Sequence, residues 1–218
     1  MDSSSFEQVS REEFDRALEQ SKASALFRKQ YARFAPSWFD EAECMMHLGH
    51  LTTDGHFRAP GFFTLITGNL HVDGIVDLQN PEGYDEGGLC VVLGDVICKS
   101  FFNEYGKCTF VDGRLEASDL LCNDFGDSSL VVLGDLKTKF FYGRDLWAEV
   151  GGRASMEYGD GYCLPIGYTA AAAQAIYPKH GAAASRALLN VAGDEHGFYA
   201  HHFREHILAG KPLLKRGL

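Results

Sequence analysis

The sequence predicts a mainly β protein: a β-helix or closely related β-solenoid of about 20-residue coils, with an N-terminal capping helix and a short α-helical C-terminal region. Three observations support this fold class. A hydrophobic motif centred on glycine recurs through the middle of the chain. Apolar residues follow each recurrence at offsets of two, and the composition turns alanine-rich after residue 160. Such repeats bury a continuous core only by stacking on one another.

The repeat is clearest in Leu89–Val96 and Ser129–Leu136, which share the letters V-V-L-G-D. Weaker copies centre on Gly68, Gly113 and Gly152, so the successive glycines are 26, 19, 21 and 18 residues apart. An offset of two is the period of a strand with one buried face, so we expect stacked inward ladders. The ladders predicted two, four and seven residues after the glycines are Leu70, Val96, Leu115, Leu136 and Ala154; Val72, Cys98, Ala117, Thr138 and Met156; and Ile75, Phe101, Leu120 and Phe141.

The glycine–aspartate coils resemble those of bacterial polymer-forming, bactofilin-like β-helix proteins over roughly residues 64–158. This resemblance implies a β-helix and, by analogy, a scaffold whose coils stack end to end between subunits. The pairs Phe101–Phe102 and Phe140–Phe141 and the varying coil length depart from a regular bactofilin core. Aromatic–glycine pairs recur as well, and predict either a corner ladder that fills the core or a platform for stacking sugars or bases; their aromatic members are Tyr105, Phe125, Tyr142 and Tyr158.

The N-terminal part, residues 1–36, is predicted to be a capping helix. Ser10-Arg11-Glu12-Glu13 fits a capping box, and apolar residues at near-helical spacing predict one helix to about Phe34, before Pro36. We expect it to cover the end of the solenoid formed by residues 37–160, because open strand edges invite polymerisation.

The C-terminal part, residues 161–218, is predicted to form the second cap within one compact domain. Its alanine-rich composition and its Gly and Pro residues predict three short helices, over residues 170–176, 182–192 and 199–209. With both ends covered, we expect a monomer or a small homo-oligomer.

The charge of the chain is concentrated in the predicted solenoid. The whole protein carries a formal charge of −10, and residues 68–160 alone hold 17 Asp and Glu against 7 Lys and Arg. Such a field repels nucleic acid and anionic membrane, and it attracts a basic protein partner. Ordinary solubility is the alternative explanation of this charge.

Other features of composition predict a cytoplasmic protein. We find no run of eighteen apolar residues, and the start of the sequence lacks the basic and apolar regions of a secretory signal. The six cysteines form no C-x-x-C motif, which fits a reducing compartment. No cofactor is expected.

The candidate contact site is an insertion at residues 79–88, in the long step between Gly68 and Gly94. Insertions in repeat proteins map to loops on one face, often the binding face, although a tolerated surface insertion is the alternative. The acidic residues and the tyrosine of this loop, with two acids expected to face outward from the coils, form the predicted partner-binding set: Glu82, Tyr84, Asp85, Glu86, Glu104 and Asp124.

Two patterns raise the question of catalysis or metal binding. His202 to His206 reads H-x-x-E-H, the inverted zinc-protease signature, but a third ligand is not fixed by the sequence, where Glu195, His196 and His201 are the nearby candidates. We therefore expect no metal site, with His202 and His206 as weak candidates.

Asp95 and Asp135 occupy equivalent positions of two repeats and could serve a carbohydrate-active enzyme. Arg114 stands at the same position of the coil between them, and an aspartate after a corner glycine is commonly a turn residue. No catalytic residue is predicted.

The sequence thus predicts a non-enzymatic acidic binding protein that captures a basic protein partner, for example an immunity protein that neutralises a cognate bacterial toxin. The alternative is a self-assembling bactofilin-like scaffold, and the third hypothesis is a carbohydrate-active β-helix enzyme.

Overall fold

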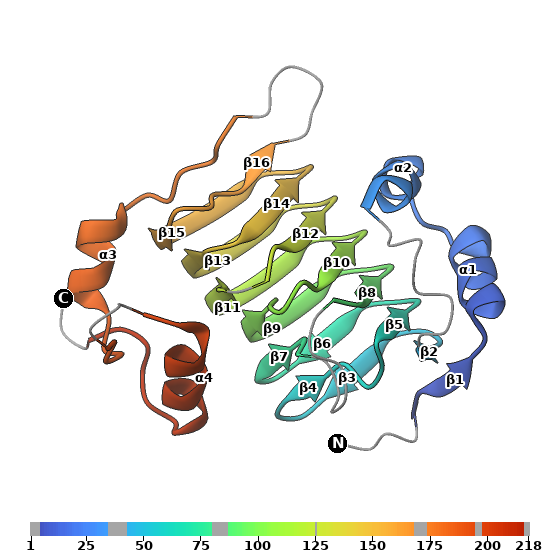
Figure 1. Ribbon diagram of the computed structural model, residues 1–218, viewed down its shortest axis with the longest axis horizontal. Coiled ribbons are helices and arrows are strands. Elements are labelled where there is room, and N and C mark those ends of the chain that lie inside the picture. Colours follow the sequence, from blue (N-terminus) through green and yellow to red (C-terminus); the bar gives the residue numbers. More distant parts are fainter. Residues whose placement is uncertain are drawn as a thin grey trace.

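The computed structural model describes residues 5–34, 43–79, 87–124, 126–167, 174–194 and 198–215. It confirms the predicted fold class, because the chain forms a β-solenoid of about 6 turns of roughly 19 residues, with few helices (Figure 1). The strands stack coil upon coil along one axis, and the helices of the N-terminal and C-terminal parts lie on opposite flanks of the stack.

Two sheets form the walls of the solenoid. All pairings along them are parallel except that between the first two strands of sheet A, which is antiparallel. In stacking order, sheet A contains β1 (Glu7–Val9), β2 (Cys44–His47), β5 (Phe63–Ile66), β8 (Leu89–Val92), β10 (Cys108–Val111), β12 (Ser128–Val132), β14 (Leu146–Val150) and β16 (Ile166–Gly167). Sheet B contains β3 (Leu51–Thr53), β6 (Leu70–Val72), β9 (Val96–Phe102), β11 (Leu115–Asn123), β13 (Leu136–Gly143) and β15 (Ala154–Gly161), with β4 (Phe57–Arg58) and β7 (Ile75–Asp77) beside them.

Each coil has three sides. One strand of sheet A forms the first side, and the two halves of the sheet B strand form the second and third. The short strands β6 and β7 show this division, because both pair with the single long strand β9. We call the side built on β3, β6 and the first halves of the long strands the open face.

The first two predicted ladders are confirmed by the strand register. Leu70, Val96, Leu115, Leu136 and Ala154 pair in sequence, and the residues two positions later follow them into the core.

The third predicted ladder is wrong in part, because the register shifts by one residue in two coils. One shift lies between β6 and β7, since Leu70 pairs with Val96 but Ile75 pairs with Ser100, and the other lies within β11, between Ala117 and Leu120. The inward row therefore contains Val76, Phe101, Leu121 and Phe141, while Ile75 and Leu120 point outward. The predicted ladder of aromatic–glycine pairs is wrong for its last two members, since Tyr142 pairs with Asp160 whereas Tyr158 pairs with Phe140; Phe125 lies outside the described residues.

The repeated glycine is required by close approach between coils. Gly134 N–H donates to the carbonyl of Gly113 at 2.9 Å, and Gly113 N–H donates to that of Gly94 at 3.1 Å. A Cβ atom built on Gly134 would lie 2.7 Å from the Gly113 oxygen. Only glycine lets the backbones stack this closely, which explains why the motif returns once in each coil.

The N-terminal part forms two helices, α1 (Arg11–Gln20) and α2 (Ala25–Phe34), so the single helix expected to Phe34 is wrong. The predicted capping box is present, with Ser10 and Glu13 bonded to each other's backbone. The chain leaves the first helix where the Ser21 hydroxyl donates to Leu18 O at 2.7 Å, and Ser24 Oγ accepts the Phe27 N–H at 3.1 Å at the start of the second. Serine competes with the helix for backbone hydrogen bonds, which accounts for the break.

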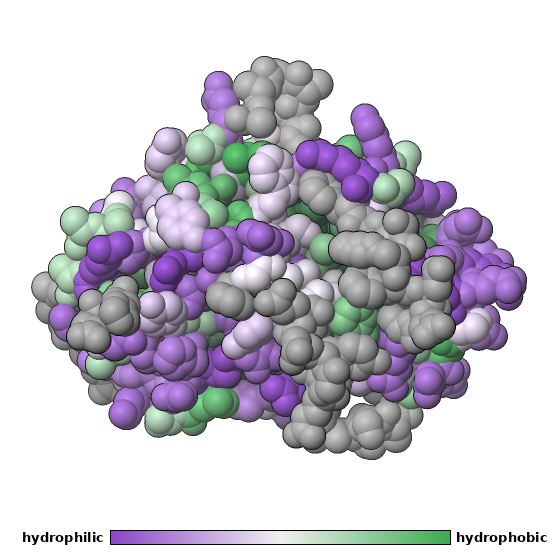
Figure 2. All heavy atoms as spheres, in the orientation of Figure 1, coloured by the Kyte–Doolittle hydropathy of each residue, from purple (hydrophilic) through white to green (hydrophobic). Residues whose placement is uncertain are grey.

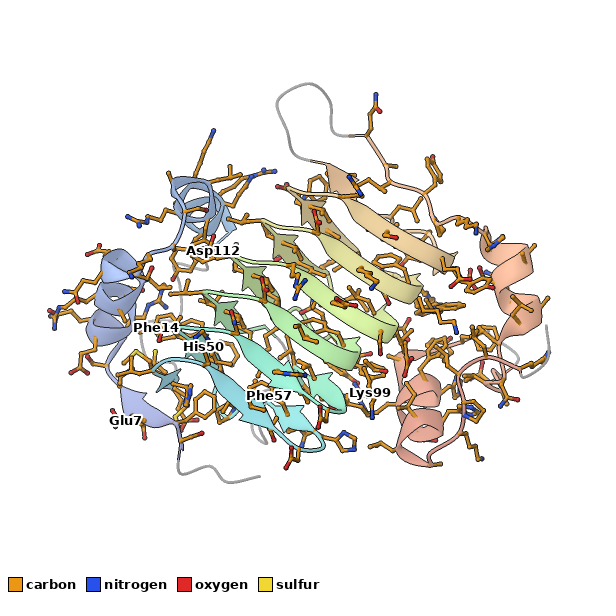
Figure 3. All side chains as sticks on the ribbon, turned by 180° about the vertical axis from the view of Figure 1, so that it is seen from behind. Glu7, Phe14, His50, Phe57, Lys99 and Asp112 are labelled. Carbon is orange, nitrogen blue, oxygen red and sulfur yellow. The ribbon has the colours of Figure 1, made fainter. Side chains whose placement is uncertain are left out.

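These helices cover a face of the solenoid, where the sequence predicted a cap on its end (Figures 1 and 3). Phe14, Leu18 and Phe27 are buried against apolar outward side chains of sheet A, namely Phe63, Leu65, Leu89, Val91, Phe110 and Val131. A strand that is apolar on both sides needs a cover on each side, so the helices are held where this second apolar surface lies.

The C-terminal part covers the third side of the coils with α3 (Ala182–Leu188) and α4 (Ala200–Leu208). Phe203 packs at the centre of this contact, with its ring 5.0 Å from that of Tyr142 and 6.2 Å from that of Phe140. The predicted helices at 182–192 and 199–209 thus correspond to shorter ones. The helix predicted at 170–176 is wrong for the residues that the structure describes, because Ala175 forms a β-bridge with Ile166. Residues 168–173 lie outside the described residues.

Extended backbone covers the two ends of the stack. At the first end, β1 pairs with β2, and the ring of Phe6 lies 6.1 Å from that of Phe57. At the other, the N–H groups of Lys179 and His180 each donate at 2.9 Å to carbonyls of β15. On the side seen in Figure 2, hydrophobic residues reach the surface only in small groups. Among the described residues, no helix is long and apolar enough to cross a membrane.

Candidate functional site

The strands of sheet B return to sheet A at one corner of each coil, and we call this the acidic corner. It comprises residues 103–107, 123–127, 143–145 and 161–162, apart from residue 125, which is not described. The predicted insertion starts and ends here, since Leu78 N–H donates to Phe102 O at 3.1 Å and Gly87 N–H donates to Tyr105 O at 2.6 Å. Glu82, Tyr84, Asp85 and Glu86 themselves lie outside the described residues.

Three residues of this corner hold left-handed backbone although none is glycine. They are Tyr105, Asp127 and Asp145, with φ angles of 57°, 49° and 46°. Aspartate tolerates this conformation better than a bulky ring does, so Tyr105 is the most strained of the three. Strain of this kind persists only where surrounding structure imposes it, and it is concentrated at functional sites.

Glu104 and Asp124 were expected to face outward into solvent, and this expectation is wrong. Both point away from the coil interior, but the C-terminal segment covers them, leaving Glu104 2% and Asp124 7% exposed. Arg204 of α4 forms ion pairs with Glu104 and with Asp77, the latter at 3.2 Å between Nε and Oδ2. These acids bind α4 to the solenoid, and the helix in turn buries them.

Asp124 binds the same helix through its backbone. Its Oδ2 atom accepts the Ala200 N–H at 2.8 Å, at the helix N-terminus, where a negative charge is favoured. Its Oδ1 atom lies 3.3 Å from Arg144 Nη1, yet it is buried and accepts no hydrogen bond from the described residues. Burial raises the pKa of this carboxyl above its ordinary value, against the lowering effects of Ala200 and Arg144.

Glu104 is the more perturbed of the two acids. Burial raises its pKa to about 7, although Arg204 acts in the opposite direction. Asp77 and Asp124 add to the increase because they are further negative charges. Three carboxylates therefore share two guanidinium groups at this place, those of Arg144 and Arg204.

A cavity of about 230 Å³ opens above these carboxylates, and we call it the corner pocket. Glu104 and Asp124 line it together with the tyrosines Tyr105 and Tyr199, while His201 and Arg204 complete the wall from α4. Cations already lie against rings around it: Arg144 Cζ is 5.2 Å from the ring centre of Tyr199, and Arg204 Cζ is 4.7 Å from that of Phe102. Carboxylates and tyrosine rings together favour positively charged groups.

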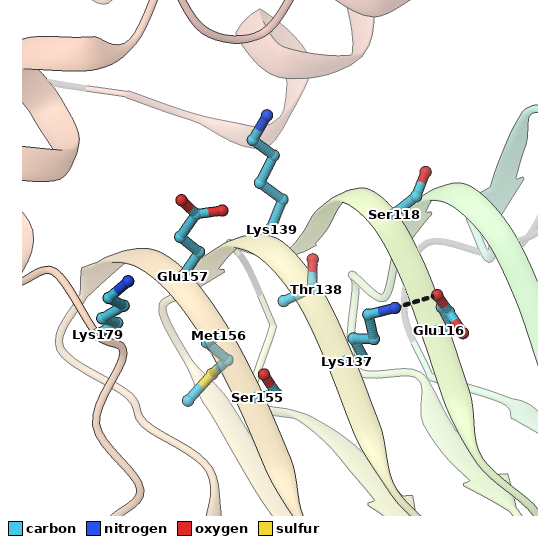
Figure 4. A pocket seen from close by; sticks show the side chains of 9 residues that line it. All are labelled: Glu116, Ser118, Lys137, Thr138, Lys139, Ser155, Met156, Glu157 and Lys179. Atoms are coloured by element: carbon cyan, nitrogen blue, oxygen red, sulfur yellow. Dashed lines mark hydrogen bonds and ion pairs between the residues drawn. The ribbon is translucent and has the colours of Figure 1, made fainter. Parts of the chain in front are cut away.

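The open face carries a hollow of about 490 Å³ (Figure 4). Its charged residues are of both signs. Lys137 pairs with Glu116 at 2.7 Å, and Lys139, Glu157 and Lys179 also line it. No helix lies over this face in the view of Figure 3, where Lys99 marks its border near α4. Its mixed charge gives no preference for a basic partner.

The histidines of the H-x-x-E-H sequence bind local backbone. His202 Nδ1 accepts the Tyr199 N–H at 3.2 Å, and His206 Nε2 hydrogen-bonds with Pro212 O at 3.0 Å. No group of three or more His, Cys, Asp or Glu that could hold a metal ion is found in the described part of the chain, which leaves out Glu195 and His196.

Asp95 and Asp135 join neighbouring coils. Their Oδ1 atoms accept the backbone N–H groups of Arg114 and Arg153, at 3.0 Å and 2.7 Å. Asp95 also pairs with the Arg114 guanidinium at 3.1 Å. These aspartates thus have a structural function in the turns, bonded to the next coil along the stack.

Sequence reasoning did not select Asp77, Tyr199 or Arg204 as site residues. The only signals were indirect, since Arg204 lies inside the H-x-x-E-H sequence and Tyr105 belongs to an aromatic–glycine pair. The fold places this protein in the class of β-solenoid proteins. Comparisons with protein-family models, curated proteins and solved structures find no match.

Proposed function

We propose that the protein is a non-enzymatic binding protein that captures a basic protein partner at the acidic corner. An immunity protein that neutralises a cognate bacterial toxin is the kind of protein that works in this way. The observation that carries the proposal is the place of the insertion: the described residues on either side of it, Leu78 and Gly87, are bonded to the acidic corner, which contains Asp127 and Asp145.

The other sides of the solenoid are less suited to this partner. The N-terminal helices cover sheet A, and α4 covers the third side of the coils. The open face is accessible but carries lysines beside its acids. At the corner, Asp127 and Asp145 reach the surface beside the place where the insertion leaves and rejoins the described chain, and their charges would steer a basic protein toward it.

Capture of the partner and mutation of the corner test this proposal. The tagged protein is used to recover partners from its source cells, and the eluate is identified by mass spectrometry. The association rate with the recovered protein is then measured for the double variant Asp127→Asn/Asp145→Asn. Asparagine removes the charge and tolerates the left-handed backbone.

The matched control is Asp54→Asn/Asp119→Asn, which removes two exposed acids elsewhere with the same change of net charge. We expect a basic protein at fixed stoichiometry, with slower association for the corner variant only. Equal effects of the two double variants, or recovery of the chain alone in large assemblies, would contradict the proposal, and the second outcome would favour a scaffold.

A further inference from the structure

We propose that the corner pocket is the anchor site for one cationic side chain, an arginine or a lysine, of the basic partner. The inference rests on the proposed function and deepens it by naming the cavity and the chemical group that enters it. It is argued from the charge balance, the aromatic walls and an unused hydrogen-bond acceptor.

Among the described residues, the carboxylates at the pocket outnumber the guanidinium groups that pair with them by one. Asp77, Glu104 and Asp124 are three carboxylates, all largely buried, and the guanidinium groups within 4 Å of them are those of Arg144 and Arg204. An uncompensated charge at a site of low dielectric is costly, and it is relieved by a proton or by another cation. A guest cation would replace the proton.

The walls of the pocket suit a guanidinium or ammonium group. Tyr105 and Tyr199 line it with Glu104 and Asp124, so that a cation inside it meets aromatic faces and carboxylates at once. The nearby contact of Arg144 with the Tyr199 ring, at 5.2 Å, shows that the corner already uses this type of interaction. Cation–π contacts become stronger where the cation loses water, as it would in this cavity.

Asp124 offers an acceptor for the guest. Its Oδ1 atom is buried and lies 3.3 Å from Arg144 Nη1, but it accepts no hydrogen bond within the described part of the chain, whereas Oδ2 is used by Ala200. Buried polar atoms without a hydrogen bond are uncommon in proteins and call for an explanation. A guest N–H group would satisfy this atom, and the cavity of about 230 Å³ gives room for the head of a lysine or arginine side chain.

The site also predicts proton release on binding. Burial raises the pKa of Glu104 to about 7, so part of the free protein carries a proton there at neutral pH. The groups that face this carboxyl are Arg204 and His201 of α4, Asp77 and Asp124 of the solenoid, and the thiol of Cys122. A bound cation favours the ionised form, so binding becomes weaker as pH falls through 7.

The test uses two peptide probes, tri-arginine amide and the neutral isostere tri-citrulline amide, titrated into the full-length protein by calorimetry. The variant is Tyr105→Asn, which removes one wall and tolerates the left-handed backbone. The matched control is Tyr162→Asn, because Tyr162 is exposed at the same corner but does not line the pocket. Circular dichroism of each variant checks that the fold is retained.

We expect tri-arginine to bind the wild type, roughly tenfold weaker binding by Tyr105→Asn, and binding by Tyr162→Asn that is unchanged within about twofold. Tri-citrulline should not bind. Titrations at neutral pH in two buffers of different ionisation enthalpy should show proton release on binding, and Glu104→Gln should abolish it. Equal weakening in both tyrosine variants, no proton release, or no binding of tri-arginine would overturn the proposal.

These outcomes are separable from the fate of the proposed function. If association of the captured partner depends on Asp127 and Asp145 but Tyr105→Asn binds tri-arginine normally, the acidic corner stands and the pocket is not its anchor. If no basic partner is recovered while the peptide still binds as expected, the pocket is a cation site and the proposed function fails.

Discussion

Replacing Arg204 by methionine tests how the buried acids beneath α4 are balanced. Methionine keeps an unbranched side chain but has no charge, so Asp77 and Glu104 lose their shared cation. Removing one partner of a buried ion pair costs about 3–5 kcal/mol when the other charge stays in place. Glu104 can avoid part of this cost by binding a proton, and the loss should therefore depend on pH.

The direction of this pH dependence follows from the pKa of Glu104, which burial raises from 4.5 to about 7 in the folded protein. Between these values the folded chain holds a proton that the unfolded chain has lost, so this group favours folding at low pH. Its contribution is lost as pH rises toward 7, and the whole shift corresponds to about 3 kcal/mol. Without Arg204 the pKa moves higher still, and stability continues to fall above pH 7. We expect Arg204→Met to cost about 1 kcal/mol at about pH 5.5 and about 3 kcal/mol at about pH 8.5.

Urea unfolding, followed by circular dichroism at these two pH values, measures the difference in unfolding free energy between Arg204→Met and the wild type. Glu104→Gln/Arg204→Met should lose most of the pH dependence, because the titrating group is gone. Arg16→Met serves as the control, since Arg16 forms an exposed pair with Glu12 and should cost less than about 1 kcal/mol at either pH. A cost of Arg204→Met that is equal at both pH values, or a dependence that survives Glu104→Gln, would refute this account of the site.

Three further predictions concern the fold. Gly134→Ala should lower the free energy of unfolding by about 2–4 kcal/mol, because its Cβ meets the carbonyl one coil below. Gly167→Ala, with open space around it, should cost less than about 1 kcal/mol. Equal costs in thermal melts would contradict the close-approach argument. Phe203→Ala should cost about 3–5 kcal/mol and speed hydrogen exchange of α4 amides, while Leu208→Ala, 54% exposed, should leave both nearly unchanged. Ser10→Ala should cost about 1 kcal/mol through loss of the capping box, and an unchanged urea midpoint would show that this helix end is not needed for stability.

The coil interior was predictable because one glycine per coil resets the register. Residues two and four positions after it therefore pair as expected, from Leu70 to Met156. The prediction failed seven positions on at Ile75 and Leu120, because the extra residue before each of them cannot be recognised without knowing which strands pair. Local shifts in two coils moved Ile75 and Leu120 out of the row, while the repeat placed Phe101 and Phe141 correctly.

The position of the helices was not predicted, although the sequence contained a signal for it. The runs at residues 63–66 and 89–92 are apolar at nearly every position, which indicates strands buried on both sides. That pattern calls for a cover over the face of the sheet. The candidate site was harder to predict, because the burial of Glu104 depends on Arg204, which is 100 residues further along the chain.

The N-terminal helices also fix how many coils lie beneath them. Phe14 of α1 packs on Phe63 in β5, and Phe27 of α2 packs on Phe110 in β10, with only residues 21–24 to join the two helices. A coil duplicated between these strands would move the two docking positions apart by one strand spacing, roughly 4.8 Å. The short connection between the two helices therefore fixes the distance between β5 and β10. Growth of this solenoid by internal duplication is easier beyond β12 than under the helices.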